Sequence, residues 1–232
     1  MAHRSVRCTF LDPGVPDVEV ALPASVQRAA GHSSFGVLLL GRTEIELNDS
    51  AADVLPDFFA AGGAEPEDQL TLRGGRRVDV GRVGGRDGTG FCFAVHVGRR
   101  RLLGAVPSGV RLTSLALWLD DLRVSPARTG IQVHPLRTHW APGREPHAAL
   151  VLVLRSGARL LVDVRPAHRP PRWGPGLAVA GGRLGRVAPT GRAEYLTLDA
   201  PAHVVHLLPP TTEHLDEVAA VGSALTVTSV PA

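Results

Sequence analysis

Histidines are the residues of this chain most suited to bind a metal ion or to move a proton, and six of the ten fall into two groups. The groups are His134, His139 and His147, and His203, His206 and His214. Two metal ligands on one strand need an even spacing, so that both imidazoles share a face. Neither His134 and His139 nor His203 and His206 meet this condition. The spacing therefore predicts no metal site, unless residues such as His96, His134 and Glu194 converge from separate segments.

A serine nucleophile is not predicted either. Gly31 stands two residues before Ser33, as in the nucleophile elbow, but that turn needs a second glycine two residues after the serine. Phe35 occupies this position, and the pattern that follows is a strand rather than a helix. We therefore predict no catalytic residue and no cofactor.

The segment 81–90 is rich in glycine and carries Arg82 and Arg86. Backbone amides in such a loop can form a nest for an anion, and the two guanidinium groups could add paired hydrogen bonds. The segment joins two predicted strands instead of opening a helix, so it matches neither dinucleotide-binding nor P-loop fingerprints. An anion site and an ordinary surface hairpin both remain open.

A second arginine-rich segment, 165–176, contains two consecutive prolines, which favour an extended and exposed path. Arg169, Arg172 and Trp173 have the composition of an interface hot spot. The alternative is a connecting loop whose tryptophan covers the core.

All 25 basic residues are arginine and none is lysine. Ile, Asn, Tyr and Met are also scarce, which indicates a GC-rich genome. The absence of lysine excludes Schiff-base and pyridoxal-phosphate chemistry, the Walker lysine and the kinase lysine. Every positive charge is instead a planar guanidinium that stays protonated.

The arginines are concentrated in the middle of the chain. Residues 73–192 hold 21 arginines against 6 acidic residues, whereas residues 1–72 hold 4 against 11 and residues 193–232 hold none against 5. Segments 73–101 and 165–192 each carry a net charge of +6. Our candidate binding residues come from these two segments: Arg76, Arg77, Arg82, Arg86, Arg99, Arg100, Arg101, Arg169, Arg172 and Trp173.

Three interpretations fit this basic middle. It could bind a polyanion, with the arginines of 73–101 tracking phosphates. It could dock on an acidic protein or on a second copy of the chain. The acidic ends could also fold back over it within the monomer. The aromatic content of 4% and the lack of a nucleic-acid-binding motif place a nucleic-acid binder last.

The elements that position these residues are mostly strands with a period of two. Phe35–Leu47 predicts one long strand bent at Gly41, and Ala149–Leu154 is apolar on both faces, as in a central strand. Val18–Leu22 and Phe91–Val97 alternate in the same way. Cys8 and Cys92 lie in predicted strands, so we expect buried, reduced thiols. Further strands are predicted at 69–73, 77–83, 101–106, 130–139, 159–165, 177–180, 183–188, 193–199, 202–208 and 224–230.

Three segments have helical features. Ser50–Ala61 follows Asn48 and Asp49, which can cap it, and precedes Gly62 and Gly63, which can end it. Apolar residues recur at helical spacing over 112–122, and Thr212–Val221 has a threonine cap and ends at Gly222. About three short helices are therefore expected.

Many short strands and few helices predict a mostly β fold, a predominantly antiparallel β-barrel or β-sandwich. We expect a single domain over 1–232, with a weak duplication of a β-hairpin unit at 91–107 and 149–166. The start of the chain lacks the apolar core of a signal peptide, and its longest apolar run is too short to span a bilayer. These features predict a cytoplasmic protein with no membrane partner.

The function expected from these features is a non-enzymatic binding or assembly module. Its Arg-rich β-hairpins and loops would contact a protein partner, a second copy of the chain or a polyanion. The alternative is a β-barrel enzyme with a small molecule in an apolar lumen, which would need a cavity lined by converging polar groups such as His96, Arg111 or His134.

Overall fold

The computed structural model describes residues 4–61, 63–83, 90–136, 140–143, 146–167, 176–190 and 194–230. Strands dominate this part of the chain, three α-helices interrupt them, and every strand pair of known register is antiparallel. The predicted mostly β, antiparallel fold with three helices is confirmed. No closed barrel is found among the described residues, so the choice between barrel and sandwich stays a prediction.

The chain divides into two compact units, and it passes between them four times. Unit 1 consists of Met1–Cys8, Val15–His32 and His147–Ala232, and unit 2 of Thr9–Gly14 and Ser33–Pro146. Strand β3 (Val26–Leu40) contributes its first half to unit 1 and its second half to unit 2. Whether the two units act as one domain stays a prediction.

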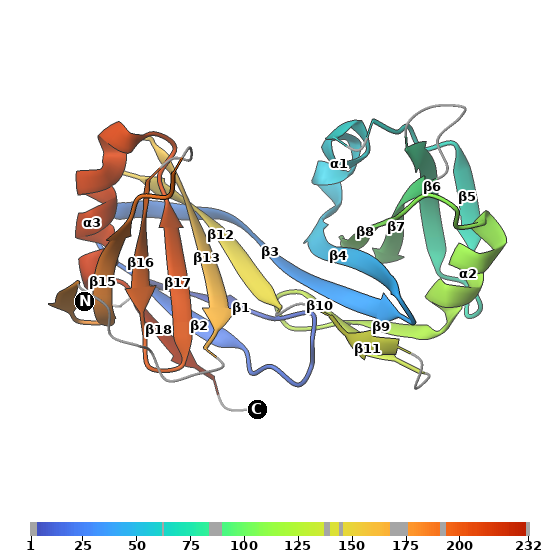
Figure 1. Cartoon of the computed structure of the whole chain (residues 1–232), viewed down its shortest axis with the longest axis horizontal. Helices are drawn as coiled ribbons and strands as arrows, with labels where there is room; N and C mark the ends of the chain where they lie inside the picture. Colours follow the sequence, from blue (N-terminus) through green and yellow to red (C-terminus); the bar gives the residue numbers. More distant parts are fainter. Residues whose placement is uncertain are drawn as a thin grey trace. The chain divides into compact units, whose positions relative to one another are not determined.

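Unit 1 contains two sheets and one α-helix (Figure 1). In one sheet β2 (Val18–Leu22) lies between β1 (Arg4–Cys8) and β18 (Thr226–Ser229). The strand order of the other is β14-β15-β16-β17-β13-β12-β3. Its strands are β12 (His147–Leu154), β13 (Arg159–Pro166), β14 (Leu177–Val179), β15 (Gly182–Val187), β16 (Tyr195–Asp199) and β17 (His203–Leu208).

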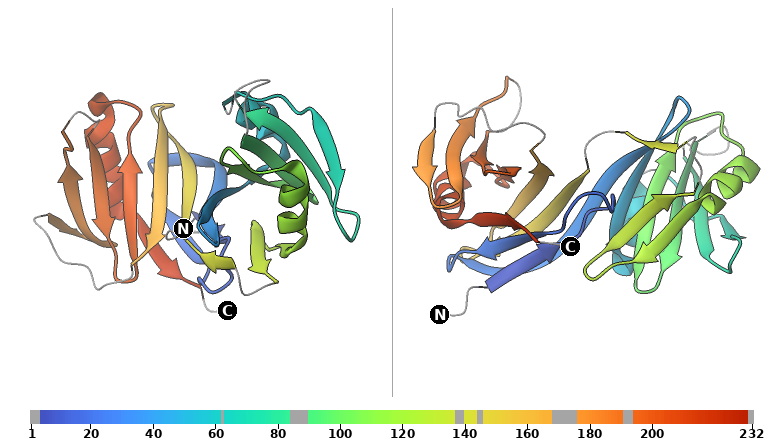
Figure 2. Two further views of the ribbon diagram at one scale, coloured as in Figure 1. Left: turned by 45° about the vertical axis from the view of Figure 1, so that its right-hand side comes forward. Right: turned by 90° about the horizontal axis from the view of Figure 1, so that it is seen from below.

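Helix α3 (Leu215–Ala224) follows a 3-10 turn (Thr212–His214) and lies against β15 and β16 (Figure 2). It buries Leu215, Val218 and Val221. Gly222, expected to end the helix, lies inside its last turn instead. A Cβ there would come within 2.7 Å of the Leu207 side chain. A larger residue at this position would therefore have to displace the ends of the Leu207 and Leu184 side chains.

Unit 2 is a sheet with the order β3-β4-β8-β7-β6-β5, to which a second hairpin and two helices are added. The sheet strands are β4 (Thr43–Ala51), β5 (Asp68–Thr71), β6 (Arg77–Val83), β7 (Gly90–Val97) and β8 (Arg100–Val106). The other elements are a 3-10 turn (Ala52–Val54), α1 (Leu55–Ala61), α2 (Leu112–Asp120), β9 (Leu122–Pro126), β10 (Ile131–Pro135) and β11 (Trp140–Pro142), which pairs with β3.

The two faces of this sheet carry side chains of different size. One face, with Phe93, Val95 and Leu102 among others, packs on α2 and the β9–β10 hairpin in the larger core of the unit. The opposite face presents small residues beneath α1, where Phe59 packs against Cys92 and Ala94. We call this second side the α1 face. The period-two alternation of β7 therefore produces two different contact surfaces.

The sequence prediction was wrong over Phe35–Leu47. The structure has two strands here, β3 and β4, joined by a tight turn in which Gly41 has a φ of +61°. Leu38 consequently pairs with Ile45 on the neighbouring strand. The predicted cap of the first helix was wrong too, because Asn48 and Asp49 lie within β4 and α1 begins only at Leu55.

The two predicted hairpin units exist, one in each unit of the fold. β7 and β8 form one, and β12 and β13 the other. Their origin by duplication stays a prediction. Both cysteines are free and buried, as expected. Within the described ranges no helix is long and apolar enough to cross a membrane.

Candidate functional site

Two predicted arginines lie on the α1 face of unit 2, in a row that crosses three neighbouring strands. Val78 of β6 pairs with Val95 of β7, and both point into the larger core, so the adjacent Arg77 and His96 point to the opposite face. His96 in turn pairs with Arg101 of β8. We call Arg77, His96 and Arg101 the arginine row. Strands lie about 4.8 Å apart, so the row is about 10 Å long at the backbone.

The central residue of the row, His96, is held by a hydrogen bond to a carboxylate. Nε2 of His96 lies 2.6 Å from Oδ2 of Asp79, and the other carboxylate oxygen accepts a hydrogen bond from Gln69 at 3.0 Å. Burial raises the pKa of Asp79, but the bonds from His96 and Gln69 and the charges of His96 and Arg77 outweigh it, so the pKa is lowered overall. Asp79 therefore stays ionised and fixes the imidazole between the two arginines.

The arginines of the row retain unused donors. Arg77 is exposed, and neither Arg77 nor Arg101 forms an ion pair within the part of the chain that the structure describes. Nη1 of Arg101 donates to the carbonyl oxygens of Gly98 and Arg100 at 3.3 and 2.9 Å, while its buried Nε has no partner there. Because this Nε is buried, an outside acceptor cannot reach it directly, and the exposed guanidinium of Arg77 is the most accessible donor of the row.

Two other predicted arginines already have partners on the opposite side of the sheet. The guanidinium of Arg82 lies over the Phe91 ring, 5.6 Å from its centroid, and 3.7 Å from the carboxylate of Glu67. Arg100 forms an ion pair with Asp49. The arginines of 73–101 that the structure describes are thus distributed over both sides of the sheet instead of forming one patch.

The remaining predicted residues are scattered or lie outside the described part. Arg99 is exposed in the turn between β7 and β8, and Arg76 is half-buried before β6, where its carbonyl oxygen accepts the amide of Leu72. Arg86, and with it most of the glycine-rich loop, lies outside the described residues. Arg169, Arg172 and Trp173 also lie outside them, so the interface loop at 165–176 stays a prediction.

Sequence reasoning missed a buried polar cluster in unit 2. Asp49, 0% exposed, accepts hydrogen bonds from Nε of Arg100 at 2.5 Å and from the amide of Ile131 at 2.9 Å. Burial raises the pKa of Asp49, and the contacts with Arg100 and Ile131 only partly offset this, so the pKa is raised overall. The cluster ties the β9–β10 hairpin to β4. Its only sequence signal was an acidic residue in an alternating strand, which could equally mark a helix cap.

Unit 1 has a second polar group that the sequence did not reveal. Asp163 pairs with His206 on the neighbouring strand, and its Oδ2 accepts two hydrogen bonds from Arg165 at 2.7 and 2.9 Å. The Tyr195 ring meets His206 edge-on at 5.6 Å. Oδ1 of Asp163 and Nδ1 of His206 are buried without a hydrogen-bond partner in the described chain. Strand register brings these residues together, and register cannot be read from spacing alone.

The enzyme alternative gains no support from the positions of its residues. His96 lies on the α1 face, Arg111 precedes α2, and His134 is on β10 beside an apolar pocket of about 210 Å³. The described residues contain no group of three or more His, Cys, Asp or Glu side chains that could hold a metal ion. Ser33, the serine of the incomplete elbow, lies within strand β3.

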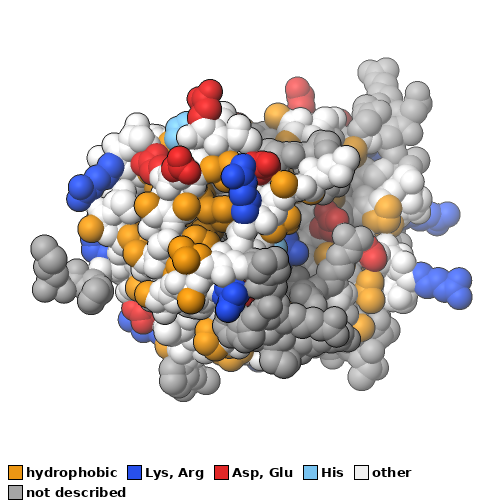
Figure 3. Space-filling view, turned by 60° about the vertical axis from the view of Figure 1, so that its left-hand side comes forward, with side chains coloured by type: hydrophobic (Ala, Val, Ile, Leu, Met, Phe, Trp, Pro, Cys, Tyr) orange, Lys and Arg blue, Asp and Glu red, His pale blue; other side chains and the backbone are white. Residues whose placement is uncertain are grey.

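Charges of both signs are interspersed on the face of the molecule shown in Figure 3, with hydrophobic side chains between them. No protein-family model, curated protein or solved structure matches this chain. The candidate site consequently depends on its own geometry and chemistry.

Proposed function

We propose that the protein is a non-enzymatic binding module whose arginine row docks an acidic segment of a protein partner. The observation that carries the proposal is the pair of guanidinium groups, Arg77 and Arg101, held on either side of an immobilised His96 with donors to spare. Hydrogen bonds from a guanidinium to a carboxylate are about twice as strong as neutral ones, and two parallel bonds also fix orientation.

The row suits a carboxylate-bearing protein better than a nucleic acid. It is about 10 Å long, which matches a few side chains rather than a phosphate track. Its strand neighbours on the α1 face include Asp79 and Gln69. Phe59 of α1 packs on the same face but is buried, so its ring is not accessible for stacking on a base. A second copy of the chain is one such acidic partner, because residues 193–232 hold five acidic residues and no arginine.

The test compares a charge-depleted row with a matched control. Arg77→Gln/Arg101→Gln removes two charges from the row, and Arg28→Gln/Arg42→Gln removes two charges from exposed positions elsewhere. Fluorescence anisotropy with a labelled octaglutamate peptide in about 0.1 M salt should show binding by the wild type. The row variant should bind about tenfold or more weakly, and the control within about twofold of the wild type.

Equal loss in both double variants would show a non-specific charge effect and reject the row as the site. Tighter binding of octathymidylate than of octaglutamate would favour the nucleic-acid interpretation instead. Sedimentation velocity of the same variants tests self-association, since a dimer formed through the row should dissociate only in Arg77→Gln/Arg101→Gln.

A further inference from the structure

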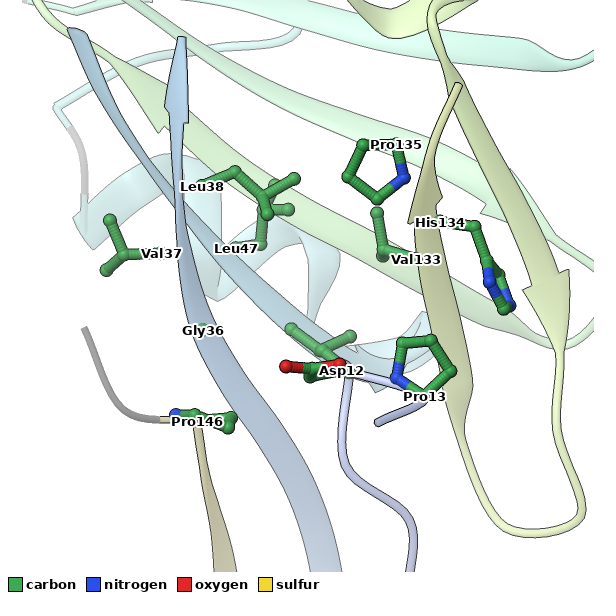
Figure 4. Close-up of a pocket in the computed structure, with 11 residues that line it drawn as sticks. Asp12, Pro13, Gly36, Val37, Leu38, Leu47, Val133, His134, Pro135 and Pro146 are labelled. Atoms are coloured by element: carbon green, nitrogen blue, oxygen red, sulfur yellow. The ribbon is translucent and has the colours of Figure 1, made fainter. Parts of the chain in front are cut away.

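An apolar pocket of about 210 Å³ lies in unit 2, separate from the arginine row. Its walls come from two hairpins: Leu38 and Leu47 on one side, and Val133 and Pro135 on the other (Figure 4). These side chains belong to the larger core or to its immediate surroundings, so the pocket is an extension of the core toward solvent. Two prolines, Pro135 and Pro146, also line the pocket, and each restricts the backbone at its own position.

One carboxylate lies among these apolar walls. Asp12 is half-buried, and Figure 4 shows its side chain between β3 and β10. Its Oδ1 accepts the amide of Gly14 at 2.8 Å, which fixes the side chain in a local turn. Within the described residues Asp12 has no ion-pair partner, although a carboxylate can accept about four hydrogen bonds.

A second titratable residue, His134, also lines the pocket, but within the described residues it forms no ion pair with Asp12. Figure 4 shows the His134 ring on the far side of its strand from Val133, whose side chain faces the apolar wall. Asp12 is therefore the one labelled side chain that brings a charge to the apolar walls. Partly desolvated charges are costly unless an opposite charge accompanies them.

We propose that this pocket binds a small organic ammonium ion, with its apolar body between the two hairpins and its cationic group on Asp12. An engineered apolar cavity of about 150 Å³ holds benzene, so a volume of 210 Å³ accommodates one ring with a short alkylamine chain. The walls supply apolar contact, and the carboxylate selects the charge. This site uses different residues from the arginine row and does not depend on the proposed function.

Three probes of nearly equal size separate charge from shape: phenethylammonium, 2-phenylethanol and phenylacetate. Ligand-observed NMR titration of the whole chain should give the tightest binding for the ammonium ion. The neutral alcohol should bind about tenfold more weakly, and the anion more weakly still, because the carboxylate contributes roughly one charge-assisted hydrogen bond.

Two variants assign the binding to this pocket. Asp12→Asn keeps an acceptor for the Gly14 amide but removes the charge, so the preference for the ammonium ion over the alcohol should disappear. Gly36→Val fills the pocket from β3, where a Cβ meets only Leu11 at 3.6 Å, and should abolish binding of both probes. Asp68→Asn, at an exposed position of β5, is the matched control and should change neither.

Three results would overturn the proposal. One is equal affinity of the wild type for all three probes, which would leave Asp12 without a role. The second is unchanged ammonium binding in Gly36→Val with a wild-type NMR spectrum, which would place the ligand elsewhere. The third is no detectable binding of phenethylammonium by the wild type at about 10 mM. This concentration is far above the dissociation constant expected for a ligand with one ring and one ion pair.

Discussion

Charged residues that are adjacent in the sequence of this protein can have very different surroundings in the fold. Arg100 and Arg101 are neighbours in the chain, yet Arg100 is paired with the buried Asp49 and Arg101 faces the opposite side of the sheet with an unused donor. The sequence predicted both as binding residues, since a run of three arginines gives no sign of which one will meet a carboxylate. The structural role of one and the free donors of the other follow from strand alternation.

Removing the guanidinium of Arg100 should be strongly destabilising. Arg100→Met leaves the carboxylate of Asp49 buried without its counter-ion, a change that typically costs about 3–5 kcal/mol. Asp49→Asn in the same chain removes the stranded charge and keeps an acceptor for the amide of Ile131, so the double variant should recover part of the loss. Urea unfolding monitored by circular dichroism measures both. A double variant no more stable than Arg100→Met would show that the buried charge is not the cause.

The two thiols should be unreactive in the folded protein. Burial and the nearby Asp17 raise the pKa of Cys8 to about 12, and burial raises the pKa of Cys92. Both therefore remain protonated at neutral pH, and the thiolate is the reactive form. Titration with Ellman's reagent at pH 7.5 should detect almost no thiol until denaturant is added, and then two per chain. Rapid modification of one thiol in the native protein would contradict this.

At the scale of elements, strands were predictable and turns between apolar strands were not. The predicted strand 77–83 has the same bounds as β6. It could be predicted because polar residues flank its apolar residues or alternate with them. Phe35–Leu40 is apolar at both alternating positions except at Gly36, so its pattern fits either face. Across the turn at Gly41, even-numbered residues of β3 come to share a face with odd-numbered residues of β4, as Leu38 does with Ile45. The apolar pattern of the sequence does not reveal this change. The arginine row could not be predicted from the sequence either, because its residues are brought together by the register of three strands.

Because α1 and the residues after it pack closely on the sheet at Gly81, we expect a side chain at this position to be destabilising. A Cβ there would lie 2.3 Å from the carbonyl oxygen of Glu65 and 3.0 Å from Phe59, so Gly81→Ala should force backbone movement and cost about 1–3 kcal/mol. Gly31→Ala, also in a strand but with nothing within 4 Å, is the control and should be neutral or slightly stabilising. Thermal unfolding of the two variants tests the difference, and equal melting temperatures would show that the loop before β5 yields easily.

At the scale of the whole molecule, buried histidines make stability depend on pH. Burial lowers the pKa of His203 below its usual 6.5, and burial together with Arg165 and His147 lowers that of His206 against the opposing charges of Asp163 and Asp199. The unfolded chain therefore binds more protons than the folded one below about pH 6.5. The free energy of unfolding should fall as the pH is lowered from 7.5 through 6.5 to 5.5.

Urea unfolding at pH 7.5 and 5.5 measures this dependence. In His203→Gln/His206→Gln the loss of stability between the two values should be clearly smaller than in the wild type. His214→Gln, in the 3-10 turn before α3, is the matched control and should retain the wild-type loss. The same loss in all three proteins would assign the effect to other groups.

The interleaving of the two units has a consequence for synthesis. Unit 2 is built from residues 9–14 and 33–146, so all of it has been translated before His147. Strand β2 pairs early with β1, but its other edge waits for β18, about 200 residues further along the chain. On a ribosome, unit 2 can thus reach its final contacts while the first strands of unit 1 still have an open edge. An open strand edge is prone to pair with other chains. Among the described strands, this edge of β2 is closed only when β18 has been synthesised.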